Sequence, residues 1–287
     1  MSANLVETKR RIQTVTSTEK ITKAMKLVAS VKFTHWKKRY DESKPYSLAL
    51  SEMLSVVLSS LPAKTLSNVR SLLDPVEGKP VLYVVCTSTL GLCGSYNYNL
   101  FRYLDPKLSK DDTLLLLGER GERHYQTFPN PKITDYSGLL KGLEAKDVES
   151  LLSALLEKYR SGSYSKVVLV YTSYHNSLIQ SPTEEVLLPL SLPSATKERA
   201  YPASLSPSPI AVLEALLPLT LKAKLNDRLL ETSVSEEASR RNAMETATDN
   251  ADDMLKTLRV DYNKARQEHI TQEITEVVAG SRASLEE

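Results

Sequence analysis

Two long segments without glycine, one at each end of the chain, constrain the fold more than any other feature. Residues 3–58 and residues 210–279 contain no Gly, and their only prolines are Pro45 and Pro218. Because Gly and Pro are the residues that most disfavour helix interiors, these segments predict long helices. At ~1.5 Å per residue the first helix would exceed ~60 Å, a length typical of a coiled coil rather than of a globular helix.

Apolar and small side chains repeat along both segments at steps of three and four residues or their multiples, which is one narrow stripe on a helix. In the first segment the stripe consists of Leu5, Ile12, Val15, Thr22, Met25, Ala29, Phe33 and Trp36. In the second it consists of Met244, Ala247, Ala251, Met254, Leu258, Tyr262 and Ala265. The stripes predict that the two helices pair as an antiparallel coiled coil with a left-handed supercoil. We expect Pro218 to kink or restart the second helix and Gly280 to end it.

The charges of the two ends are complementary. Residues 1–44 are rich in Lys and Arg, whereas residues 231–287 are rich in Asp and Glu. This asymmetry favours pairing between the ends of the chain. A basic arm also fits an adaptor that binds nucleic acid or an anionic membrane, which is an alternative from a different class of function.

Between the two helical segments the composition changes to short apolar runs separated by amphipathic stretches. The runs are 81–86, 114–117 and 167–171, and residues 145–160 carry a helical pattern. Buried strands that alternate with helices predict an inserted Rossmann-like α/β domain with a mainly parallel sheet. Residues 183–190 would add an edge strand. The expected domains are a coiled-coil helix at 1–60, the α/β domain at 61–205 and a coiled-coil helix at 206–287, with a loop at 62–77 and a Pro/Ser-rich connector at 201–209.

The sequence offers no arrangement typical of an enzyme. The loop 88–95 follows a strand and contains two glycines, but it lacks the Lys of a phosphate-binding loop. We therefore expect a tight turn there, with no bound cofactor. No Ser/His/Asp or Cys/His pattern indicates catalysis, and no spacing of Cys and His indicates a metal site. Cys86 and Cys93 are expected to be reduced. No apolar run reaches the ~20 residues that span a bilayer.

Several stretches resemble one family. Residues 12–29 read IQTVTSTEKITKAMKLVA, residues 91–99 read GLCGSYNYN, residues 235–254 read SEEASRRNAMETATDNADDM, and residues 262–280 read YNKARQEHITQEITEVVAG. The residues of these motifs, and the order of the motifs along the chain, are similar to those of the gamma subunits of F-type ATP synthases. The resemblance covers essentially the whole chain.

The resemblance implies a central-stalk rotor that catalyses nothing itself. In this family the coiled coil passes through a ring of three alpha and three beta subunits, which bind the nucleotide. The globular insert lies near the epsilon subunit and the membrane rotor ring of c subunits. Rotation couples ion flow to ATP synthesis or hydrolysis. The implied location is the cytoplasmic face of a bacterial plasma membrane, with the matrix side of the mitochondrial inner membrane as the alternative. No nucleic acid is implied.

The resemblance also implies which residues meet partners. On the first helix, the residues expected to face the alpha/beta ring are Lys20, Ile21, Thr22, Lys23 and Met25. On the second helix they are Arg266, Gln267, Thr271 and Glu273. In the insert, Gly91, Leu92, Cys93 and Gly94 are expected on the side of epsilon and the rotor ring.

One position departs from the family pattern. Gamma subunits usually carry an Asp and then a basic residue directly before GLCG, whereas this chain carries Thr89 and Leu90. The change removes a charge pair from the loop. It keeps open the alternative of a gamma-like paralogue in a specialised rotary ATPase.

Overall fold

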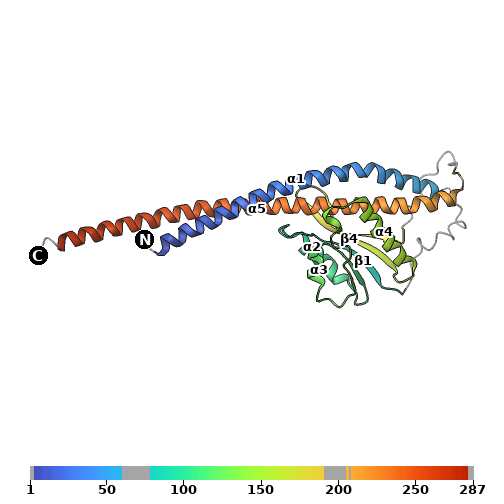
Figure 1. Cartoon of the computed structure of the whole chain (residues 1–287), viewed down its shortest axis with the longest axis horizontal. Coiled ribbons are helices and arrows are strands. Elements are labelled where there is room, and N and C mark those ends of the chain that lie inside the picture. Colours follow the sequence, from blue (N-terminus) through green and yellow to red (C-terminus); the bar gives the residue numbers. More distant parts are fainter. Residues whose placement is uncertain (1–2, 60–77, 191–204, 207, 284–287) are drawn as a thin grey trace. The chain divides into compact units, whose positions relative to one another are not determined.

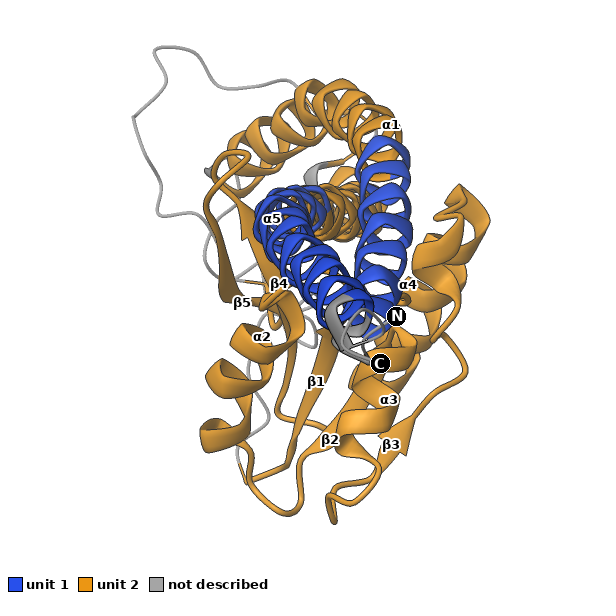
Figure 2. Ribbon diagram, turned by 90° about the vertical axis from the view of Figure 1, so that its left-hand side faces the viewer, with its two compact units in different colours: residues 1–28, 241–287 blue, residues 29–240 orange. Residues whose placement is uncertain are grey.

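The computed structural model describes residues 3–59, 78–190, 205–206 and 208–283. Contacts divide the chain into two compact units, which Figure 2 distinguishes by colour. Unit 1 comprises residues 1–28 and 241–287, and unit 2 comprises residues 29–240. The three domains expected from the sequence stay a prediction, because these units follow contacts rather than chain segments. The loop expected at 62–77 and most of the connector at 201–209 lie outside the described residues.

Two long helices supply the ends of the chain, as the absence of Gly predicts. Helix α1 spans Ala3–Ser59 and helix α5 spans Pro209–Ala283 (Figure 1). Pro218 lies inside α5 and does not divide it into two elements, and Pro45 lies inside α1. The expectation that Gly280 ends the second helix is wrong, since α5 continues to Ala283. A single Gly costs a helix only ~1 kcal/mol and need not stop it. Among the described residues no helix combines the length and apolar character needed to cross a membrane.

In unit 1 the helices pair in antiparallel orientation. The hydroxyls of Thr22 and Thr248 are hydrogen-bonded at 2.9 Å, and Lys26 forms an ion pair with Glu245 at 2.7 Å. From Thr22 to Lys26 in α1, the contacted residue of α5 changes from Thr248 to Glu245. The two helices therefore run in opposite directions, as expected. The hand of the supercoil stays a prediction.

The seam of α5 differs from the expected stripe at one point. Leu255 is buried, with 6% of its surface exposed, whereas Met254 is 55% exposed. Met244, Ala251 and Leu255 are buried, and they are separated by seven and four residues. The buried positions of α5 therefore repeat at slightly more than 3.5 residues, so that Leu255, and not Met254, faces α1.

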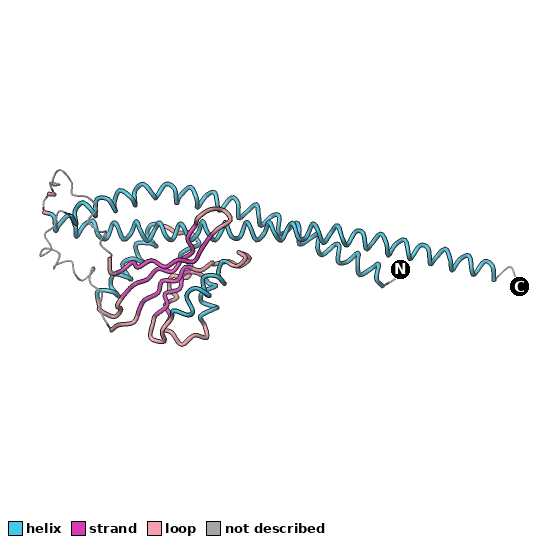
Figure 3. The backbone as a smooth tube through the Cα atoms, turned by 180° about the vertical axis from the view of Figure 1, so that it is seen from behind, coloured by secondary structure: helices cyan, strands magenta, loops and turns pink. Residues whose placement is uncertain are grey.

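Unit 2 contains a five-stranded sheet in the order β3-β2-β1-β4-β5. Its strands are drawn in magenta in Figure 3. The strands are β1 Val81–Cys86, β2 Thr113–Leu117, β3 Lys132–Ile133, β4 Lys166–Tyr174 and β5 Gln180–Leu188. Four strands are parallel, and β5 pairs with β4 in antiparallel orientation. This confirms both the mainly parallel sheet and the edge strand.

Helices cover both faces of the sheet. They are α2 Tyr96–Leu104, α3 Glu119–Tyr125 and α4 Ala145–Arg160, with short 3-10 turns η2 Asp105–Lys107 and η3 Leu139–Lys141. Alternate side chains of the strands enter two cores. One core joins Val84 and Leu169 to α4, α1 and α5, and the other joins Val85 to α2 and Tyr125. Because both faces are covered, the central strands β1 and β2 and much of β4 are continuously apolar.

Candidate partner-contact surfaces

On α1, most of the residues expected to face the ring are accessible. Lys20 is exposed, Ile21 has 59% of its surface exposed, and Met25 is half-buried. The side chain of Lys23 is 68% exposed and only 3.9 Å from Glu19. Thr22 is different, because it is buried against Thr248 inside the helix pair. Its position therefore does not favour direct contact with a partner.

On α5, the expected ring-facing residues are all exposed: Arg266, Gln267, Thr271 and Glu273. The Thr271 hydroxyl donates to the carbonyl of Gln267 at 2.9 Å, and Glu273 lies 3.3 Å from His269. These local bonds hold the polar side chains close to their own helix.

The same stretch of α5 also exposes an apolar stripe that sequence reasoning missed. Ile270, Ile274 and Val277 are 41%, 59% and 72% exposed, at steps of four and three residues. These steps put the three side chains on one face of the helix. The steps of four and three were visible in the sequence, but they begin five residues after Ala265 and so lie on a different face from the predicted stripe.

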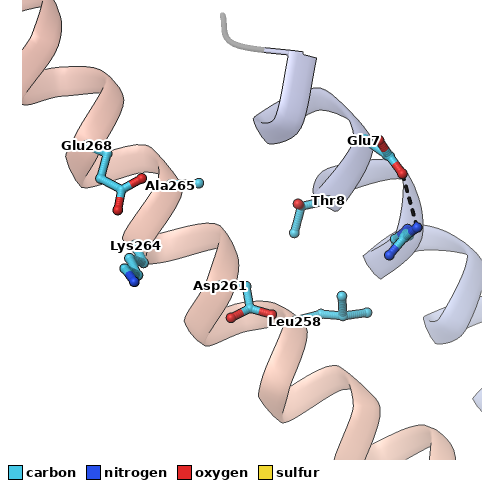
Figure 4. A pocket seen from close by; sticks show the side chains of 8 residues that line it. Glu7, Thr8, Leu258, Asp261, Lys264, Ala265 and Glu268 are labelled. Carbon is cyan, nitrogen blue, oxygen red and sulfur yellow. Dashed lines mark ion pairs between the residues drawn. The ribbon is translucent and has the colours of Figure 1, made fainter.

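A polar groove of about 370 Å³ lies between α1 and α5 in unit 1 (Figure 4). Thr8 and Leu258 line it together with charged residues such as Asp261 and Glu268. Glu7 and Arg11 on its rim form an ion pair at 3.1 Å within α1. At this level most of the side chains that line the space between the two helices are polar or charged.

The loop after β1 contains the expected residues 91–94 in a tight turn. Leu92 and Gly94 have positive φ values of 62° and 58°, which confirms the expected turn. The Asn97 side chain accepts from the Ser88 amide at 3.0 Å and donates to the Ser88 hydroxyl at 2.7 Å. Cys93 is buried beneath the turn, and burial raises the pKa of its thiol. Both cysteines are free thiols, as expected.

This loop lies where sheets of this class bind ligands. The chain leaves β1 towards β2 on one side, while β4 lies on the other side, so the carboxyl ends of β1 and β4 form a topological switch point. Here α5 packs at that point. Arg240 of α5 donates to the carbonyls of Leu90 and Gly91 at 3.2 and 3.3 Å. The Glu231 carboxylate accepts from the Ser173 hydroxyl at 2.6 Å at the end of β4.

Buried charges fix α5 beside the loop. Arg240 forms ion pairs with Glu236 and, at 2.7 Å, with Glu237, and all three side chains are buried or nearly so. Burial raises the pKa of Glu236, and Arg240 only partly offsets that effect. Sequence reasoning missed this cluster, although opposite charges three and four residues apart on a helix were visible in the sequence.

A second set of ion pairs joins α5 to the edge strand. Arg228 lies 2.5 Å from Glu185 of β5 and 3.0 Å from Glu231, and Lys224 lies 3.0 Å from Glu185. Nearer the far end of α5 in unit 2, Ser239 donates to Gln180 at 2.9 Å. Along their contact, α5 and β5 therefore run in opposite directions.

Comparison with known proteins decides the family. A family model described as ATP synthase matches residues 4–283. The ATP synthase gamma chain of Heliobacterium modesticaldum is 35% identical over 287 residues, which cover 96% of this chain and 97% of that protein. The gamma chain of Clostridium kluyveri is 34% identical over 284 residues, covering 98% of each. The chain belongs to the ATP synthase gamma family. It is accordingly a central-stalk subunit of an F-type ATP synthase complex.

Solved structures share the fold of this gamma-family chain. A chain in the structure of the Tetrahymena thermophila mitochondrial ATP synthase central stalk and c-ring matches with a TM-score of 0.55 at 24% identity, covering 79% of this chain and 99% of that one. A chain from the Euglena gracilis mitochondrial enzyme matches with a TM-score of 0.54 at 20% identity, covering 91% and 94%. Both likenesses support the pairing of long terminal helices with an inserted α/β domain.

Proposed function

We propose that this subunit is a non-catalytic rotor that couples ion flow through a membrane rotor ring to ATP synthesis or hydrolysis in a ring of three alpha and three beta subunits. Full-length similarity to gamma chains carries the proposal. The exposed polar side chains of α5 in unit 1, such as Arg266 and Glu273, support it. A pair of helices resists twisting better than one helix, and a polar surface permits sliding contacts. The nucleotide belongs to the partners, and this chain binds no cofactor or nucleic acid.

For the ring contact we propose two groups of residues in unit 1. They are Lys20, Ile21, Lys23 and Met25 on α1, and Arg266, Gln267, Thr271 and Glu273 on α5. We propose a different role for Thr22, because its hydroxyl bonds to Thr248 between the helices. There it sets the spacing of the pair.

For Gly91, Leu92, Cys93 and Gly94 we propose a place on the side of the epsilon subunit and the membrane rotor ring. The loop lies in unit 2, and Arg240 of α5 holds it by donating to the carbonyl of Gly91.

Reconstitution tests the proposed function. The purified chain alone should hydrolyse no ATP. Mixed with alpha and beta subunits, it should give an active complex that contains one copy of this chain per three beta subunits, as measured by native mass spectrometry. ATP turnover by the chain alone, or a different copy number, would contradict the proposal. The proposed location is peripheral, on the cytoplasmic face of a bacterial plasma membrane or on the matrix side of the mitochondrial inner membrane.

A second candidate is a gamma-like paralogue in a specialised rotary ATPase. The observation that favours it is the uncharged pair Thr89 and Leu90 in the loop. Purification of the native complex, with identification of its subunits, separates the two candidates. An adaptor that binds nucleic acid or membrane predicts steeply salt-dependent binding to RNA or anionic vesicles, and no binding at low salt would remove it.

A further inference from the structure

One buried carboxylate of α5 in unit 2 bonds directly to the end of β4. Glu231 has only 3% of its surface exposed. Its Oε1 atom accepts from the Ser173 hydroxyl at 2.6 Å and from the backbone amide of Tyr174 at 3.0 Å. Hydrogen bonds weaken steeply away from their preferred angles, so two bonds to neighbouring residues of one strand fix the direction of that strand as well as its distance. Glu231 therefore ties α5 to the sheet at one defined point.

The same stretch of α5 also bonds to the edge strand and to α1. Oε2 of Glu231 accepts from Arg228 at 3.0 Å, and Arg228 pairs with Glu185 of β5 at 2.5 Å. One turn earlier in α5, Asp227 accepts from the Ser43 hydroxyl of α1 at 2.6 Å. Two strands and both long helices thus meet in one group of polar side chains. We call this group the Glu231 cluster, and it consists of Ser43, Ser173, Glu185, Asp227, Arg228 and Glu231.

The side chains of α5 next to the cluster make a different kind of contact. Leu225, Leu229 and Val234 are fully buried in the apolar core that α5 shares with the sheet. Apolar burial is non-directional, so it resists separation of two elements more than it resists their sliding or turning. Buried polar groups, in contrast, can specify one arrangement of the elements that they join. The Glu231 cluster can therefore resist a twist of the sheet about the helices.

We propose that Glu231 is a positioning residue through which torque passes between the inserted α/β domain and the two helices of unit 2. The inference rests on the proposed function, in which the insert lies on the side of the rotor ring and the helix pair contacts the alpha/beta ring. If the sheet turned about α5 without moving it, ion flow and nucleotide turnover would no longer be linked. The two bonds from Glu231 to β4 prevent that slip.

The first test measures ion transport and ATP hydrolysis together, in vesicles that contain the whole complex. Glu231→Leu keeps an apolar side chain in the core but removes the acceptor of both bonds to β4. We expect this complex to hydrolyse ATP while less ion transport accompanies each ATP. Glu231→Gln retains one acceptor oxygen for β4 and should preserve most of the transport. Ser173→Ala removes a single bond and should lower transport in the same direction, by less.

A variant that is destabilised elsewhere in the same contact separates transmission from stability. Leu225→Ala removes fully buried apolar atoms from α5 and leaves the cluster intact. Like Glu231→Leu, it should melt several degrees below the wild type, but it should keep the transport per ATP of the wild type. The proposal is wrong if Leu225→Ala loses as much coupling as Glu231→Leu. It is also wrong if Ser173→Ala couples like the wild type, a result that remains decisive should Glu231→Leu fail to assemble.

The second test uses the purified full-length chain and needs no partner. Spin labels attached through Leu178→Cys, in the turn between β4 and β5, and Met53→Cys, on α1, lie at exposed positions, whereas the two native cysteines are buried. Electron–electron double resonance should give a broader distribution of distances between the labels in Glu231→Leu than in Leu225→Ala. Equal widths would contradict the inference whatever the function. Absence of ion transport by the wild-type complex would contradict the proposed function instead.

Discussion

At the scale of single residues, two glycines near the carboxyl edge of the sheet differ in how much they constrain the backbone. Gly118 joins β2 to α3 with a φ of +110°, and a Cβ there would lie 2.2 Å from the carbonyl oxygen of Thr87. Gly138, which precedes η3, has open space around the position of a Cβ. The first glycine is required by both its backbone angle and its close neighbour, whereas the second is not.

Alanine substitutions should separate these two glycines. We expect Gly118→Ala to destabilise the chain by more than ~3 kcal/mol, because the Thr87 backbone cannot move without disturbing β1. Gly138→Ala should be neutral or stabilising by ~0.5 kcal/mol, through a less flexible unfolded chain. Urea unfolding of both variants measures the difference. Equal stabilities would mean that the Thr87 carbonyl does not press against Gly118.

The contribution of Glu236 to the free energy of unfolding should become less favourable as the pH rises, whereas most carboxylates show the opposite dependence. Burial raises the pKa of this carboxyl above its usual 4.5, so its charge disfavours the folded state wherever the unfolded chain would be ionised. Its unfavourable contribution should therefore be absent below pH 4.5 and should grow as the pH rises from 4.5 to the raised pKa.

Glu236→Gln removes this contribution and keeps the shape of the side chain. We expect the variant to be as stable as the wild type or more stable near neutral pH, and to lose its advantage as the pH falls towards 4.5. Thermal unfolding at several pH values measures the difference. Glu149→Gln, whose exposed carboxyl has a pKa lowered by Lys222, should show the opposite trend. A wild type that gains stability over Glu236→Gln with rising pH would contradict the assignment.

At the scale of elements, the contact between α1 and α5 in unit 1 buries few side chains. Only a few of the described side chains there are buried, among them Thr22, Met244, Ala251 and Leu255. Threonine and serine hydroxyls bond to carbonyls four residues earlier in α1, for example Thr14 to Arg10 at 3.1 Å and Thr18 to Thr14 at 3.0 Å. These bonds satisfy the hydroxyls, but they weaken a helix slightly and do not stabilise it. Stability of unit 1 therefore depends on a small number of contacts.

Two neighbouring positions of α5 test the seam. Leu255→Lys buries a charge and removes an apolar side chain, so it should weaken the helix pair by ~2–4 kcal/mol. Met254→Lys alters an exposed position and should cost less than ~0.5 kcal/mol. Hydrogen exchange of residues 241–283 should rise in the first variant and stay unchanged in the second. The reverse result would favour the stripe expected from the sequence.

At the scale of the whole molecule, the rotor role makes position 25 sensitive to charge. Met25 is half-buried on α1, where we propose that the helix meets a beta subunit. Met25→Lys should leave the complex assembled while less ion transport accompanies each ATP hydrolysed. Met53→Lys, at an exposed methionine of the same helix in unit 2, is the control. Transport and hydrolysis are measured together in reconstituted vesicles. Unchanged coupling in Met25→Lys would mean that this position carries no torque.

The sequence by itself determined the long helices, the α/β insert and the family. Gly-free segments, apolar runs such as 81–86 and the family-like stretches at residues 12–29 and 235–254 are local signals. They predicted β1 and α4 to the residue, whereas α2, α3 and β3 were not predicted. The exposure of Arg266 and Glu273 also follows from helical periodicity. These features depend on neighbours in the chain, which a sequence displays directly.

Only the tertiary structure decided which polar side chains lie inside. Thr22 faces Thr248, Leu255 replaces Met254 in the seam, and Arg240 reaches the carbonyls of the loop after β1 across about 150 residues of sequence. The burial of Glu236 and Glu237 depends on where α1 and the loop pack against α5. A charge on a helix has the same spacing whether it faces water or a groove, so its environment emerges only when distant segments meet.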